Sequence, residues 1–158
     1  NAGPCLPAAA LYDASRIVEM TEGGTRFSDI TYTGEITNVN VICRYVEDQP
    51  VRAELEIDFA FGKGPQATSN SHQYQYWVAV TRRSSKVLAK EYFAVDADFG
   101  GSTVDGSREV LQDIIIPRAD DTISGANFEI VVGFQLTDEE LAFNREGRRF
   151  RLDAASGS

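Results

Sequence analysis

Side chains that carry out catalysis or hold metals are scarce in this chain. Its 158 residues include one histidine, His72, and two cysteines, Cys5 and Cys43. The zinc and phosphate-binding motifs CxxC, HExxH and GxxxxGK[ST] are all missing. A Ser-His-Asp triad would have to use His72, which lies in a stretch rich in Ser, Asn and Gln with no nucleophile-elbow motif. We therefore expect no metal, no cofactor and no catalytic residues, and we interpret His72 as a solvated loop histidine; a hydrolase built on it is the alternative.

Positive charge and long apolar runs are also lacking. Lys and Arg number 15 against 24 Asp and Glu, which gives a formal net charge of −9. This balance argues against binding to nucleic acid or to anionic membrane surfaces. No apolar run approaches the roughly 20 residues of a membrane-spanning helix. The composition is that of one globular domain over residues 1–152, with an N-terminal arm (1–11) and a small, polar, disordered tail (153–158).

Alternation of apolar and polar residues runs through most of the chain. In residues 51–61 every second position is apolar and most of the positions between are charged, which predicts a strand with one buried face. Residues 127–136 alternate in the same way but carry Val131 and Gly133 on the second face, which predicts a central strand. Further strands are expected over 29–45, 73–81, 86–96 and 109–117, and a short last one is possible over 148–152.

Short strands at regular spacing, separated by turn signals, predict the class of fold. We expect an all-β, antiparallel immunoglobulin- or fibronectin-like β-sandwich of about seven strands, with a barrel or an α+β fold as alternatives. The apolar parity flips after Asn38, which predicts a β-bulge at Thr37–Asn38. Leu11–Met20 has no clean period and fits a short strand or one helical turn equally well. Asp105-Gly106-Ser107 is expected to interrupt the chain between two strands.

One short helix is expected at the C-terminal end, from Asp138 to about Glu146. Thr137 and Glu140 have the spacing of a capping box, and Leu136 and Leu141 have the spacing of a hydrophobic staple. Acidic residues in the first turn suit the positive end of the helix dipole. The helix is too short to be stable alone, so we expect it to pack on the sheets.

The two cysteines stand in unlike surroundings. Cys5 lies in a Pro-rich arm and Cys43 in an expected strand. We expect a Cys5–Cys43 disulfide that holds the arm to a sheet, with two free thiols as the alternative. A disulfide would place the protein outside the cytoplasm.

Aromatic residues gather on two neighbouring expected strands. Exposed Tyr and Trp side chains are typical binding anchors, although in a core they would form cross-strand pairs. The predicted binding residues are Tyr74, Tyr76, Trp77 and Tyr92. The aspartates of expected loops are interpreted as solvated turn residues rather than calcium ligands because no EF-hand spacing is present; they are Asp96, Asp98, Asp105, Asp120 and Asp121.

Five short motifs follow one another across nearly the whole domain. They are the Cys-Leu-Pro arm at Cys5, Val-Ile-Cys-Arg-Tyr at 41–45, Trp-Val-Ala-Val at 77–80, Val-Leu-Ala-Lys-Glu-Tyr-Phe at 87–93, and Val-Val-Gly-Phe-Gln-Leu-Thr-Asp-Glu-Glu-Leu-Ala-Phe-Asn-Arg at 131–145. In this order the chain resembles uncharacterised cell-envelope (outer-membrane) lipoproteins of alphaproteobacteria. The resemblance implies a lipidated cysteine upstream of Asn1 and a periplasm-facing domain. Cys5 departs from a lipobox because Pro4 precedes it, which favours Cys5 as the bridging cysteine.

These observations predict a non-enzymatic periplasmic lipoprotein domain. We expect it to act as an accessory or scaffold subunit, or a protein-interaction module, of an envelope complex. A carbohydrate-binding β-sandwich module that uses the aromatic residues is the alternative. Envelope proteins are the expected partners, nucleic acid is not, and the membrane is reached only through the upstream lipid anchor.

Overall fold

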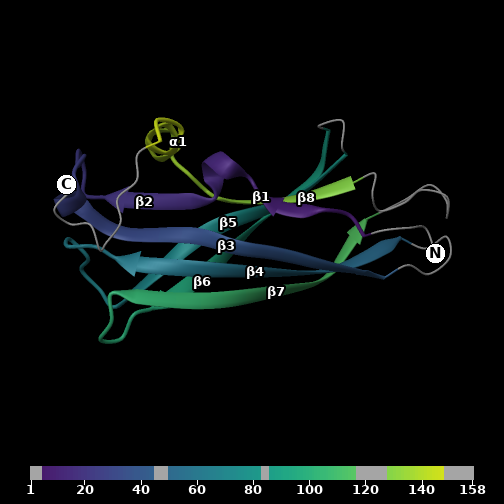
Figure 1. The fold of residues 1–158 in the computed structure, drawn as a ribbon, viewed down its shortest axis with the longest axis horizontal. Helices are drawn as coiled ribbons and strands as arrows, with labels where there is room; N and C mark the ends of the chain where they lie inside the picture. The colour runs from purple at the N-terminus through teal and green to yellow at the C-terminus, as the bar shows by residue number, and fades with distance from the viewer. Residues whose placement is uncertain (1–4, 45–49, 83–85, 117–127, 148–158) are drawn as a thin grey trace.

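Two four-stranded sheets lie face to face and account for most of the structure (Figure 1). The computed structural model describes residues 5–44, 50–82, 86–116 and 128–147. The strands are β1 (Ala8–Ala10), β2 (Arg16–Met20), β3 (Ile30–Arg44), β4 (Val51–Lys63), β5 (Ser71–Arg82), β6 (Val87–Asp98), β7 (Val104–Ile116) and β8 (Phe128–Phe134), and the helix is α1 (Asp138–Arg145). The first sheet has the order β1-β8-β5-β6 and the second the order β2-β3-β4-β7. The predicted all-β architecture with one short helix is confirmed.

The apolar core fills the space between the inner faces of the two sheets. Inward residues of β4 such as Leu55, Ile57 and Phe59 are at most 3% exposed, as their alternation predicts. On the facing sheet, β8 lies between β1 and β5, and its Phe128 and Phe134 are each 1% exposed. The prediction of a central strand over this segment is therefore confirmed.

Three segments of the sequence have an irregular pattern, and the structure agrees with the prediction for some of them only. The register between β3 and β4 shifts between Ile36 and Asn38, which confirms the predicted bulge. The segment Leu11–Met20 contains both a 3-10 turn (Tyr12–Ala14) and the strand β2. The predicted interruption at 105–107 is wrong, because these residues lie within β7 and pair with β4. The long partner strand supplies their backbone hydrogen bonds, which outweighs the turn preference of the local sequence.

The N-terminal arm is fixed to both sheets. The predicted disulfide forms between Cys5 and Cys43, with the two Cα atoms 5.3 Å apart, and it links the arm to β3. Leu6 is 1% exposed and belongs to the core, and β1 pairs with β8 in parallel. With β2, this arm strand brings the number of described strands to eight rather than about seven.

Helix α1 begins where the sequence predicts. The Thr137 hydroxyl accepts a hydrogen bond from the Glu140 backbone N–H at 3.1 Å, and the Glu140 carboxylate accepts one from the Thr137 N–H at 2.8 Å. The helix packs beside β2 and the turn before it. No helix in the described part of the chain is long and apolar enough to cross a membrane. The possible strand over 148–152 lies outside the described residues.

The capping box gives a first testable prediction. Thr137→Ala is expected to lower the free energy of unfolding by about 1 kcal/mol, because the Glu140 N–H loses its acceptor. Chemical denaturation of the variant and the wild type measures this difference. Thr137→Ser, which keeps the hydroxyl, is the matched control and should lose much less. Equal losses in the two variants would contradict a role for the cap.

Candidate functional site

The predicted aromatic binding group is divided between the two faces of the first sheet. Tyr74 and Tyr76 point into the core and are 1% and 0% exposed. The Tyr74 hydroxyl donates to the carbonyl of Thr33 at 2.7 Å, and the Tyr76 hydroxyl donates to the carboxylate of Glu109 at 3.2 Å. Burial raises the pKa of both tyrosine hydroxyls above their ordinary value, so both stay protonated. These two residues stabilise the core and cannot contact a ligand at the surface.

Trp77 and Tyr92 lie together on the outer face of the same sheet. They are directly opposite each other on β5 and β6, and Tyr92 is 57% exposed. The Trp77 indole N–H donates to the carbonyl of Phe134 at 3.1 Å. The Lys90 ammonium lies 4.6 Å from the Trp77 ring centroid and 5.4 Å from that of Tyr92, so it contacts both rings. The four predicted residues therefore do not form one surface, and only Trp77 and Tyr92 remain as an outer aromatic pair.

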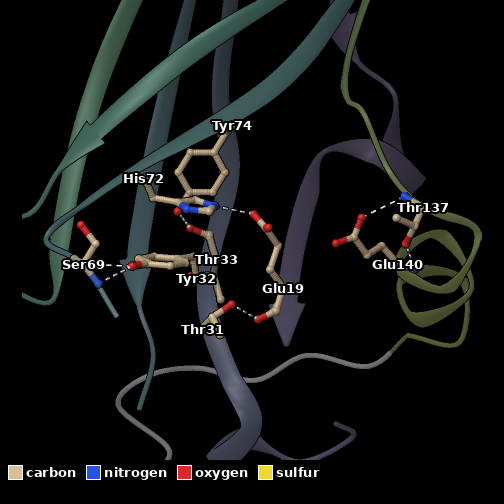
Figure 2. Close-up of polar contacts among 9 residues, drawn as sticks. All are labelled: Glu19, Thr31, Tyr32, Thr33, Ser69, His72, Tyr74, Thr137 and Glu140. Atoms are coloured by element: carbon tan, nitrogen blue, oxygen red, sulfur yellow. Dashed lines mark hydrogen bonds and ion pairs between the residues drawn. The ribbon is translucent and has the colours of Figure 1, made fainter. Parts of the chain in front are cut away.

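His72 is part of a packed polar group rather than a solvated loop. Figure 2 shows its ring lying flat against Tyr32, with the two centroids 3.9 Å apart, and directed toward Glu19. The His72 Nε2 atom is 2.8 Å from a Glu19 carboxylate oxygen, which joins β5 to β2 across the sandwich. The loop interpretation was wrong because β5 begins at Ser71, two residues earlier than the sequence pattern indicates.

The hydrogen bonds around His72 fix the position of its neighbours. The Tyr32 hydroxyl donates to the Ser69 carbonyl at 2.8 Å and accepts from the Ser69 N–H at 2.9 Å (Figure 2). In the described part of the chain, no serine, threonine or cysteine side chain hydrogen-bonds to His72. A nucleophile paired with the base is the central requirement of a hydrolytic triad. The contacts of His72 with Glu19 and Tyr32 therefore connect the two sheets.

The two sheets separate along the side formed by the edge strands β6 and β7. A cleft of about 500 Å³ opens there, which lies within the range of roughly 300–1,000 Å³ that is usual for binding sites. In Figure 1 the β5–β6 hairpin rises away from the far end of β7. Most of the residues that line the cleft are apolar, and Lys90, Glu91 and Gln112 also border it. The seven apolar residues are Val78, Val80, Ala89, Phe93, Val110, Leu111 and Ile114.

The opening of this cleft has a local cause in β6. From Val87 to Tyr92 every residue of this strand is exposed, whereas Val95 and Ala97 farther along the same inner face are buried. Ala89 lies opposite Val80 and contributes only a methyl group to the lining of the cleft. The first half of β6 therefore presents apolar surface that the described residues leave uncovered.

One acidic side chain faces this apolar cleft. Glu91 is paired with the inward-facing Val78, so it lies on the inner face of β6 between Ala89 and Phe93. It makes no salt bridge or hydrogen bond within the described part of the chain. Lys90, its neighbour, is directed to the opposite face by its contacts with Trp77 and Tyr92. The cleft thus combines a mainly apolar lining with the carboxylate of Glu91, which has no ion-pair partner among the described residues.

Sequence reasoning missed this cleft, although one signal was present. The inward positions of β6 are Ala89, Glu91, Phe93, Val95 and Ala97. A single carboxylate in an otherwise apolar series is costly to bury, so it marks a place where the core does not close. The signal could be interpreted only once the face of each residue was known.

Comparisons with known proteins add no assignment to this site. No protein-family model, no curated protein and no solved structure matches the chain. Within the residues that the structure describes, no three His, Cys, Asp or Glu side chains come together in a group that could hold a metal ion. Asp120 and Asp121 lie outside those residues. The function must therefore be argued from the geometry of the cleft.

Proposed function

We propose that the protein is a non-enzymatic interaction module of the bacterial cell envelope that binds a protein partner in the cleft between β6 and β7. The observation that carries this proposal is the cleft of about 500 Å³, which is lined mainly by apolar side chains and bounded by β6 and β7, the edge strands of the two sheets that the described residues form. Apolar pockets with few polar groups are the usual form of a binding site. A role as an accessory or scaffold subunit of an envelope complex follows from such a surface.

The location in the envelope is part of the same proposal. The Cys5–Cys43 disulfide is compatible with an oxidising compartment such as the periplasm. The resemblance to envelope lipoproteins supports a lipid anchor attached upstream of Asn1. The negative net charge of −9 is consistent with a domain that does not itself adhere to an anionic membrane.

The immunoglobulin- or fibronectin-like type of sandwich is also kept as a proposal. Two face-to-face sheets with a common apolar core support it. The hairpin of β3 and β4 within one sheet differs from the arrangement in immunoglobulin domains, whose strands B and C lie in different sheets.

A photo-crosslinking residue placed in the cleft tests the proposed binding surface. Ala89 faces the cleft on β6, and Ala94 on the same strand lies on the outer face opposite Gln75; both alanines are exposed. With the crosslinker at position 89, we expect a covalent product with a defined envelope protein in intact cells of the native host. At position 94 we expect none.

The partner identified in this way can then be purified and tested directly. Ala89→Trp should fill part of the cleft and weaken binding of that partner by at least about tenfold, which is about 1.4 kcal/mol. Ala94→Trp is the matched control and should leave binding unchanged. Equal crosslinking at the two positions, or equal loss of binding in the two variants, would refute the cleft as the binding surface.

Glycan binding by Trp77 and Tyr92 is the second candidate. Their position as neighbours on an outer face favours it, because exposed aromatic rings can stack on sugars. The Lys90 ammonium already contacts both rings, so a sugar would compete with it. Trp77 is the only tryptophan, and a shift of its fluorescence on addition of envelope glycans would support this candidate.

A further inference from the structure

We infer that the partner enters the cleft as an extended β-strand that pairs with the free edge of β6 and places a lysine or arginine opposite Glu91. This inference rests on the proposed function and specifies the chemistry of the occupant. Three features of the described residues support it: the unpaired backbone of β6, the spacing of the apolar lining, and the charge of Glu91.

The backbone of β6 offers hydrogen bonds that no other described strand uses. Among the strands that the structure describes, β6 ends the order of the first sheet and pairs only with β5. In a strand, alternate backbone N–H and C=O groups point to either side, so half of those in β6 are directed away from β5. An extended segment laid along this edge would continue the sheet, which is a common way for proteins to recognise peptides.

Every second side chain of such an added strand would face the cleft. Residues opposite Ala89, Glu91 and Phe93 would face inward, because directly opposite residues of paired strands lie on the same face. They would fill the space between these residues and Leu111 of β7.

The charge at Glu91 selects which strand can bind. A partner with a basic residue opposite Glu91 would form an ion pair in surroundings with an apolar lining, where charge pairs are screened less than at an open surface. An acidic residue at this position would be repelled. The excess of negative charge over the whole chain acts in the same direction.

The same charges disfavour a second copy of this chain as the occupant. Antiparallel pairing of two β6 strands centred on the cleft would bring Glu91 opposite Glu91 of the copy, or Lys90 opposite Lys90. Either register places like charges directly against each other. An inward charge on an edge strand is a known means of preventing self-association, and here it also discriminates between partners.

Two synthetic peptides test this inference on the whole purified domain. The first is Val-Thr-Val-Thr-Lys-Thr-Val-Thr-Val, and the second carries Glu in place of the central Lys. We expect the Lys peptide to bind at least about tenfold more tightly than the Glu peptide in a calorimetric titration. Glu91→Gln should remove most of this preference and Glu91→Lys should reverse it. Asp96→Asn, on the outer face of the same strand, changes the net charge equally and should keep the preference.

Hydrogen exchange of the backbone amides tests the strand pairing separately from the charge. The Lys peptide should slow exchange at the amides of Val87–Phe93 that point away from β5, and leave those of β2 unchanged. Binding without this protection, or a charge preference that survives Glu91→Gln, would overturn the inference. Protection that rises with protein concentration in the absence of peptide would indicate a second copy and would also overturn it. If any of these results overturned the inference while crosslinking at position 89 still gave a defined product, the proposed function would still hold.

Discussion

A double variant, Cys5→Ser with Cys43→Ser, is expected to lose about 4 kcal/mol of unfolding free energy. The bond closes a loop between residues 38 positions apart. In the chain-entropy treatment a loop of this length restricts the unfolded chain by about that amount. For a domain of 158 residues this corresponds to a fall of about 10 °C in the melting temperature.

Denaturation with and without a reducing agent measures the effect of the bond. The wild type in reductant should behave as the double variant does, and reductant should leave the double variant unchanged. Agreement between the two routes separates the loss of the bond from any effect of the serine side chains. A loss below about 1 kcal/mol would show that the unfolded chain is already restricted by other means.

The position of the bond allows stability and binding to be distinguished. The disulfide fixes the arm next to β1, whereas the cleft lies along β6, and β1 and β6 are the opposite edges of the first sheet. At a temperature where the reduced protein remains folded, we therefore expect peptide binding to persist. The disulfide contributes to the stability of the domain, and the open edge supplies the proposed recognition.

Local patterns in the sequence were sufficient to predict much of this fold. Alternation identified the buried positions of β4 and β8 because the side-chain period of a strand is fixed by its backbone. The parity flip at Asn38 located the bulge, and the spacing of Thr137 and Glu140 located the start of α1. Each of these signals depends on residues within a few positions of one another.

Features that depend on distant partners were not accessible in this way. Tyr74 and Tyr76 were predicted as binding residues because alternation shows which residues share a face but not which face is buried. The start of β7 was missed since it depends on pairing between Gly106 and Ala60, 46 positions away in sequence. The cleft depends on how two sheets diverge, which no short segment encodes.

The contact between α1 and β2 is the clearest case of a long-range interaction without a sequence signal. Asn144 is 3% exposed, and its side-chain amide donates to the carbonyls of Asp13 and Arg16, both at 2.8 Å. The Asn144 backbone carbonyl in turn accepts from the Arg16 guanidinium at 3.3 Å. One amide group therefore fastens the C-terminal helix to a segment about 130 residues earlier in the chain.

Asn144→Ala is expected to lower the free energy of unfolding by about 3 kcal/mol, because two carbonyl groups lose their donor where little water can replace it. Chemical denaturation measures this loss. Arg145→Ala is the matched control on the next residue of the helix: its salt bridge to Asp13, at 3.4 Å, is formed by a side chain that is 63% exposed. Exposed ion pairs contribute about 0–1 kcal/mol, so the control should lose less. If the two variants were equally stable, the docking of α1 would depend on its apolar face rather than on this amide.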